Sequence, residues 1–95
     1  MEIPKQVKIG GHIYKVEFQE QTDLSENDCG QTVRTKGIIA IDRDLIQSEK
    51  EVTFFHEVIH IINGEIEEVE CDFIAQTIYA FLKDNNLLNG NTKVE

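Results

Sequence analysis

This chain contains two histidines that lie four residues apart, His56 and His60. On a helix, side chains four residues apart stack on one face about one turn from each other, so both imidazoles can reach a single metal ion. Glu57 follows the first histidine and points toward the same side, where its carboxylate can polarise a water held in an open metal position. The pattern therefore predicts a metal site on a helix.

The residues around this pair favour a helix over about 49–63. Ser48 followed by Glu51 has the spacing of a capping box for a helix that begins near Glu49, and Asn63-Gly64 is a typical stop. Large apolar residues lie nearly all round this helix, which indicates burial on more than one side: Phe54, Phe55, Val58, Ile59, Ile61 and Ile62. The polar stripe that remains consists of Thr53, His56, Glu57 and His60. Buried imidazoles and carboxylates need a partner, and a metal ion would supply one.

Length and charge limit the other function classes. Ninety-five residues suffice for one domain, residues 1–95, with 89–95 expected to be a frayed polar tail. The net charge of −9 argues against nucleic acid or an anionic membrane as the main partner. There is no apolar segment of membrane-spanning length and no signal-peptide pattern. We therefore expect a cytoplasmic protein whose two cysteines, Cys29 and Cys71, are reduced thiols.

Two hairpins are predicted before the motif helix. Gln6–Ile9 and Ile13–Gln19 have the alternation of half-buried strands, and Gly10-Gly11 between them is a turn pattern. Residues 23–30 are polar and turn-rich, which is typical of a loop. Gln31–Thr35 and Ile38–Asp42 form the second hairpin around Lys36-Gly37.

A second helix is predicted over about 66–85. Its apolar positions have helical spacing: Cys71, Ile74, Ala75, Ile78, Phe81 and Leu82. The expected fold class is therefore α+β, with a small antiparallel or mixed sheet of two hairpins packed on the motif helix and on this second helix.

The acidic residues that open the second helix are candidates for a third metal ligand, because a catalytic zinc usually has three protein ligands and a water. Glu68 lies four residues after Gly64, as His60 lies four before it, so a tight helix hairpin brings the two to similar height. Glu67 lies only about 100° from Glu68 around the helix, so it remains an alternative third ligand. Asp72, one turn beyond Glu68, can accept the free N–H of a ligating histidine.

Two segments together resemble a known family. His56–His60 has the sequence HExxH, and Glu68 to Ala75 is similar to a stretch of the ImmA/IrrE-type zinc metallopeptidases of bacteria, mobile elements and phages. The whole chain looks like a minimal phage or prophage member of this gluzincin-like group. The resemblance implies a zincin-like fold, His56, His60 and Glu68 as zinc ligands, Glu57 as general base and Asp72 as support for a ligand.

The family's larger members carry a histidine or tyrosine for the oxyanion on a separate downstream domain, and we expect no such domain within these 95 residues. Tyr79, on the same helix side as Glu68, is the nearest candidate for that catalytic role, and Tyr14 or His12 could approach from the sheet. The apolar strand Ile38–Ile41 is either the sheet edge on which an extended peptide docks or a central strand.

Two functions follow as hypotheses. The first is a zinc peptidase that acts on a narrow protein substrate, such as a regulator by family resemblance. The second is a binding or regulatory module that has no significant hydrolytic activity and in which zinc stabilises the fold, since a bound zinc ion can stabilise a domain with a small core. The sequence does not predict an oligomeric state.

Overall fold

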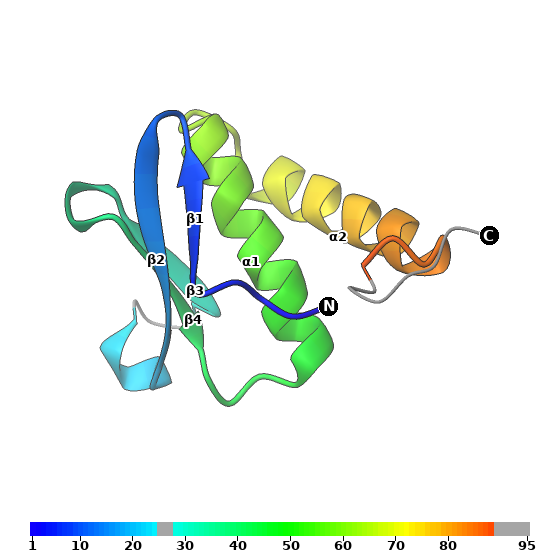
Figure 1. Ribbon diagram of the computed structural model, residues 1–95, viewed down its shortest axis with the longest axis horizontal. Coiled ribbons are helices and arrows are strands. Elements are labelled where there is room, and N and C mark those ends of the chain that lie inside the picture. The colour runs from blue at the N-terminus through cyan, green and yellow to red at the C-terminus, as the bar shows by residue number, and fades with distance from the viewer. Residues whose placement is uncertain (25–27, 89–95) are drawn as a thin grey trace.

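Four strands and two α-helices make an α+β fold in the computed structural model, which describes residues 1–24 and 28–88. The strands form one mixed sheet in the order β1-β2-β4-β3. Helix α1 packs on the sheet, and α2 packs on α1 on the side away from the strands (Figure 1). The predicted fold class is thus confirmed. The middle of the predicted loop and the predicted tail, residues 89–95, lie outside the described residues.

The first hairpin joins β1 (Gln6–Ile9) to β2 (His12–Gln19) in antiparallel register. Gly10 and Gly11 have φ of 59° and 84°, the left-handed backbone that glycine adopts without steric cost. Tyr14 is the buried residue of β2, whereas Ile13 is 53% exposed. A short 3₁₀ turn, Gln21–Asp23, follows β2.

The second hairpin joins β3 (Gly30–Val33) to β4 (Ile38–Asp42) through the 3₁₀ turn Arg34–Lys36 and Gly37. Strand β4 lies between β2, which is parallel to it, and β3, which is antiparallel. Its Ile39 and Ile41 are fully buried. The apolar strand is therefore central, so the hypothesis that it forms the sheet edge is wrong. The edges of this sheet are β1 and β3.

Helix α1 runs over Gln47–Ile62 and begins without the predicted capping box. Its N-cap is Ile46, and no side chain caps it. Glu51 does not cap the backbone at the helix start, because its carboxylate is buried and accepts hydrogen bonds from the side chains of Gln47 (Nε2, 2.8 Å) and Tyr79 (Oη, 2.9 Å). The predicted stop is correct, since Asn63 is the C-cap.

Two apolar clusters lie on opposite sides of α1, as its all-round apolar pattern predicts. On the sheet side Phe54 packs with Tyr14, Ile39 and Ile41. On the other side Val52 packs with Ala75 and Tyr79 of α2, which runs over Glu68–Asp84. The motif helix is thus held between the sheet and α2, and this fixes the direction of its polar stripe.

Helix α2 buries a narrower face than the sequence predicts. Cys71, Ala75 and Tyr79 are its buried residues. Three residues of the predicted stripe are exposed to solvent: Ile74 (36%), Ile78 (41%) and Phe81 (59%). No helix in the described part of the chain has the length and apolar character needed to cross a bilayer.

Candidate metal centre

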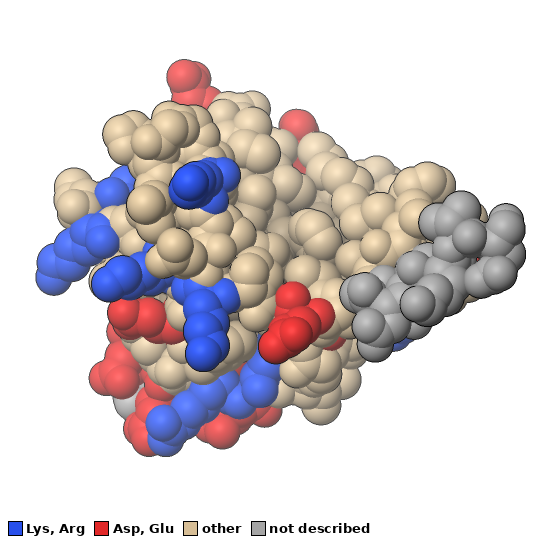
Figure 2. Space-filling view, viewed as in Figure 1, with Lys and Arg blue, Asp and Glu red and all other residues tan. Residues whose placement is uncertain are grey.

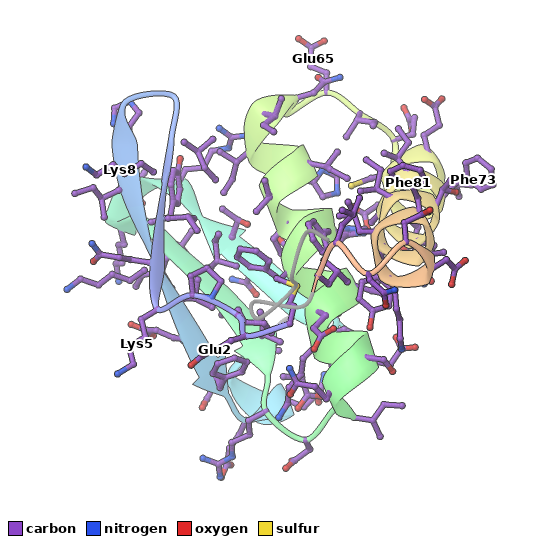
Figure 3. The ribbon with its side chains drawn as sticks, turned by 45° about the vertical axis from the view of Figure 1, so that its right-hand side comes forward. Glu2, Lys5, Lys8, Glu65, Phe73 and Phe81 are labelled. Atoms are coloured by element: carbon purple, nitrogen blue, oxygen red, sulfur yellow. The ribbon has the colours of Figure 1, made fainter. Side chains whose placement is uncertain are left out.

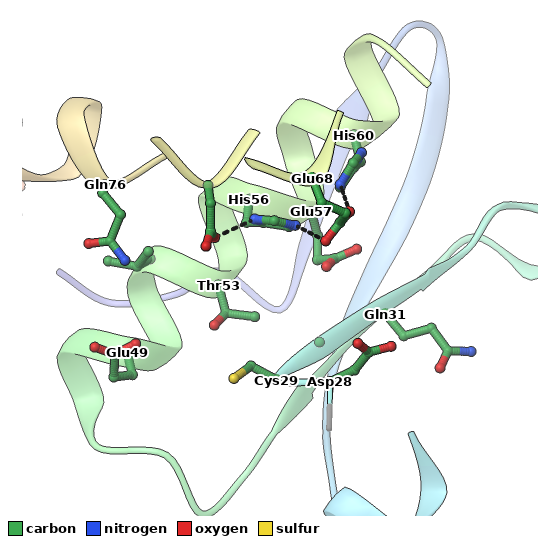
Figure 4. A pocket seen from close by; sticks show the side chains of 13 residues that line it. Asp28, Cys29, Gln31, Glu49, Thr53, His56, Glu57, His60, Glu68 and Gln76 are labelled. Carbon is green, nitrogen blue, oxygen red and sulfur yellow. Dashed lines mark hydrogen bonds and ion pairs between the residues drawn. The ribbon is translucent and has the colours of Figure 1, made fainter. Parts of the chain in front are cut away.

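The two motif histidines lie one turn apart on α1, with ring centroids 4.7 Å apart. The Nε2 atoms of both rings face the carboxylate of Glu68 from α2 (Figure 4). One Glu68 oxygen contacts Nε2 of His60, and the other lies 3.5 Å from Nε2 of His56. Three groups that commonly bind metal thus converge between the two helices.

The second nitrogen of His56 also has a partner on α2. Its Nδ1 lies 3.0 Å from Oδ1 of Asp72. A carboxylate on Nδ1 favours the tautomer that leaves Nε2 free of hydrogen, and a histidine bound to metal through Nε2 needs this tautomer. The Asp72 carboxylate thus lies within hydrogen-bond distance of the His56 nitrogen that points away from Glu68.

A third donor near the histidines is the thiol of Cys71. The ligand atoms of His56, His60 and Cys71 all lie within 4.8 Å of one another, which makes this triad a candidate metal site. The thiol is fully buried and donates to the carbonyl oxygen of His56 at 3.2 Å. Burial, reinforced by the negative charge of Glu68, raises the pKa of Cys71 to about 11. The free thiol is therefore protonated at neutral pH, and ligation would have to release its proton.

Glu57 is the buried acid of the site, with 6% of its surface exposed. Burial raises its pKa above the usual carboxylate range, and the hydroxyl of Thr32 on β3 opposes this by donating to Oε1 at 2.6 Å. A carboxylate with a raised pKa accepts a proton more readily near neutral pH than an exposed one.

These groups line an open cleft of about 550 Å³ between α1, the start of α2 and the β3 edge (Figure 4). Most of the described residues around it are polar, and five of them are acidic: Asp28, Cys29, Gly30, Gln31, Glu49, Val52, Thr53, His56, Glu57, His60, Glu68, Asp72 and Gln76. No lysine or arginine is among them, so the cleft favours cationic or neutral ligands over anionic ones.

The structure brings together five of the predicted site residues: His56, Glu57, His60, Glu68 and Asp72. It does not bring Tyr79 to them, because that hydroxyl is buried against Glu51, and burial raises its pKa to about 12. Glu67 is exposed and is not among the described residues of the cleft. His12 and Tyr14 line a separate hollow beside Arg34.

Two residues of the site were not predicted. Cys71 follows Glu68 by three positions and lies on the same helix side, so its spacing could have indicated a ligand in place of a core residue. Thr32 could not have been found in this way, because its contact with Glu57 depends on how β3 packs against α1.

Comparisons of the chain with models of protein families, with curated proteins and with solved structures find no match.

Proposed function

We propose that this chain is a zinc-dependent peptidase whose cleft lies between α1, α2 and β3. The observation that supports this most is the meeting of two imidazole Nε2 atoms, the Glu68 carboxylate and the buried Glu57 carboxylate in one cleft. Two histidines and a glutamate are one of the ligand sets that catalytic zinc takes, with a further position left open for water. Kinship with the ImmA/IrrE-type peptidases is part of the same proposal and rests on the His56–His60 and Glu68–Ala75 segments.

The donors present fit zinc. Imidazole nitrogen and carboxylate oxygen suit this ion, and His56 has the carboxylate contact at Nδ1 that commonly orients a zinc-bound histidine. His56, His60 and Glu68 would hold the ion. When bound, zinc lowers the pKa of a water toward 7 and polarises the carbonyl to be attacked.

Glu57 would act as the general base. Its raised pKa matches the task of taking a proton from the attacking water and passing it to the leaving amine. The Thr32 hydroxyl fixes one of its oxygens, so the carboxylate keeps its orientation in the cleft.

The substrate would be an extended peptide. Strand β3 is a sheet edge and contributes Gly30 and Gln31 to the cleft, so a peptide laid along it runs past the histidines. The acidic lining favours segments with lysine or arginine near the scissile bond.

A second function is favoured by one observation, the closeness of Cys71 to the two histidines. If the thiolate joins His56, His60 and Glu68, four protein ligands close the site, as in structural zinc centres. The protein would then be a binding module that zinc stabilises, without hydrolysis.

Three substitutions separate these functions. Glu57→Gln keeps size and hydrogen bonding but cannot take a proton, so metal content should stay near normal while hydrolysis falls about 10²–10⁴-fold. Glu68→Gln should weaken zinc binding, because it removes an anionic ligand. Cys71→Ser should leave both metal binding and hydrolysis near normal.

The measurements are zinc affinity, cleavage of a lysine-rich fluorogenic peptide library, and the absorption of the cobalt-substituted protein. A sulfur-to-cobalt charge-transfer band that Cys71→Ser abolishes, with no hydrolysis in the wild type, would favour the closed structural site. Loss of metal in Glu57→Gln, with normal binding in Glu68→Gln, would contradict the assigned roles.

A further inference from the structure

Strand β3 presents a hydroxyl to the proposed general base. Thr32 Oγ1 donates to Oε1 of Glu57 at 2.6 Å, although the two residues are 25 positions apart in the chain. That distance is in the range of hydrogen bonds from a hydroxyl to an ionised carboxylate, which are roughly twice as strong as bonds between neutral groups. Glu57 is 6% exposed, so little water competes for this contact. The bond therefore fixes the orientation of the carboxylate in the cleft.

The two oxygens of Glu57 have different surroundings. Among the described residues, Thr32 is the only donor to this carboxylate, and it contacts Oε1 alone. No fully buried side-chain oxygen in the described part of the chain lacks a hydrogen-bond partner. Because Oε2 has no such partner and Glu57 lines the cleft (Figure 4), Oε2 is the oxygen that is open to the cleft.

Gly30 determines how closely β3 approaches the base. A Cβ at this position would lie 2.5 Å from Cγ2 of Thr53 and 3.5 Å from Cγ of Glu57. Side chains two residues apart on a strand lie on the same face, so the Thr32 hydroxyl and the position that a Gly30 side chain would occupy both face α1. A larger residue in place of Gly30 would move β3 away from α1 and lengthen the bond between Thr32 and Glu57.

Thr32 also lies where the proposed peptide would dock. In the antiparallel pair of β3 and β4, the Cys29 carbonyl accepts from the Asp42 amide at 2.7 Å, so every second residue from Cys29 onward turns its backbone groups to β4. The N–H and C=O of Gly30 and Thr32 therefore face the open edge of the sheet. An extended peptide on that edge would contact the backbone of the residue whose side chain holds Glu57.

The donor to Glu57 is neutral, and no lysine or arginine competes with it among the described residues of the cleft. Nearly all of the basic side chains visible in Figure 2 lie on the sheet side of the molecule. Lys5 and Lys8 project from the β1 side of the sheet in Figure 3, and β1 is the edge opposite β3. A hydroxyl orients a carboxylate without neutralising its charge, so Glu57 keeps its capacity to accept a proton.

We propose that Thr32 is a positioning residue for peptide hydrolysis and that Oε2 of Glu57 is the atom that carries the proton. The Thr32 hydroxyl holds Oε1, so Oε2 takes a proton from the attacking water as the water oxygen bonds to the carbonyl carbon. When the C–N bond breaks, Oε2 gives that proton to the leaving nitrogen, and Glu57 is ionised again. This role rests on the proposed function and adds to it the contact on which the proton transfer depends.

Steady-state hydrolysis and zinc affinity of Thr32 variants test this role. Thr32→Val keeps the shape and strand preference of threonine but cannot donate, so kcat should fall about ten- to a hundredfold while KM and zinc affinity stay near the wild-type values. Thr32→Ala, a second variant without the hydroxyl, should show the same loss. Thr32→Ser keeps the donor and should restore most of kcat. Thr35→Val is the matched control, because Thr35 is exposed in the turn after β3 and does not line the cleft.

Each outcome separates this role from the proposed function. A wild type that hydrolyses peptides while Thr32→Val keeps its kcat would overturn the role of Thr32 and leave the proposed function standing. Equal losses in Thr32→Val and Thr32→Ser, or a loss that follows weakened zinc binding, would overturn the role as well, because the hydroxyl would then not act through Glu57. A zinc-bound wild type without any hydrolysis would contradict the proposed function, and the role of Thr32 with it.

Discussion

Among single residues, Glu51 connects α1 to α2 through a buried carboxylate. Only 4% of the residue is exposed, and an ionised carboxylate at such a position is stable only with donors around it. Tyr79 Oη and Gln47 Nε2 provide them. The tyrosine that the resemblance suggests for catalysis has here a structural contact between helices.

We therefore expect Tyr79→Phe to lower the free energy of unfolding by about 1–3 kcal/mol, the cost of leaving a buried acceptor short of a donor. Urea unfolding measures this. Glu49→Gln, an exposed acid on the same helix, is the control and should change stability by less than about 0.5 kcal/mol. Equal effects of the two substitutions would contradict the role given to Glu51.

The same pair predicts a pH dependence. Burial, with the Glu51 hydrogen bond adding to it, raises the pKa of Tyr79 from 10.0 to about 12. The folded chain therefore keeps this proton after the unfolded chain has lost it, and the stabilisation is complete below pH 10 and is lost as the pH rises to 12. The stability difference between wild type and Tyr79→Phe should shrink over that range, and a constant difference would exclude the linkage.

Among the elements, the turn after β3 holds the end of the motif helix. Arg34 Nη2 donates to the carbonyl oxygens of His60 (2.5 Å) and Ile61 (3.2 Å), which have no amide partner in the last turn of α1. A cation at a helix C-terminus also interacts favourably with the helix dipole. Arg34 thus connects the backbone of His60, at the end of α1, to the turn that follows β3.

Arg34→Ala should destabilise the protein by about 1 kcal/mol, in the range of exposed C-terminal charge and hydrogen-bond effects. Because His60 loses its anchor, zinc affinity should fall as well. Lys36→Ala, an exposed basic residue of the same turn, is the control. Chemical unfolding and competitive zinc titration of both variants check this, and unchanged zinc affinity in Arg34→Ala would show that His60 does not need the anchor.

The elements themselves could be predicted from local patterns. Alternation and glycine turns gave both hairpins, and helical spacing gave both helices within one or two residues at most ends. The predicted capping box of α1 is wrong. Ser48 and Glu51 have the spacing of a capping box, but the Glu51 side chain is hydrogen-bonded to Tyr79 of α2. The buried face of α2 is narrower than predicted because helical spacing locates apolar residues but does not show whether another element packs on them.

The closeness of His56 and His60 could also be predicted from spacing, and so could the height of Glu68, because both depend on helix geometry. The contact between Glu57 and Thr32 could not be predicted from spacing. Gly30 lets β3 approach α1 closely, since a Cβ there would lie 2.5 Å from Cγ2 of Thr53. That approach brings Thr32 to Glu57, and no local pattern encodes it.

In the molecule as a whole, negative charge is concentrated at the candidate metal centre. Glu57, Glu68 and Asp72 surround two histidines in a chain that already carries a net charge of −9. A divalent cation between the helices would offset this repulsion and connect α1 to α2. Folding and metal binding should therefore be coupled.

Removing metal with a chelator should lower the melting temperature, and added zinc should restore it. Binding to the folded state alone contributes about 4 kcal/mol when free zinc is a thousandfold above the dissociation constant. His56→Ala is the control, and its melting should not respond to zinc. A wild-type midpoint that is the same with chelator and with zinc would argue against a site between the helices.

The proposed function requires that one metal ion binds between α1 and α2 through His56 and His60. Diffraction from a zinc-loaded crystal, recorded on both sides of the zinc absorption edge, tests it most directly. We predict one anomalous peak per chain within bonding distance, about 2.0–2.1 Å, of Nε2 of both histidines, with a Glu68 oxygen as the third ligand. A zinc-loaded protein whose anomalous peak lies elsewhere, or that has no peak beside these two rings, would rule out a metal site at His56 and His60.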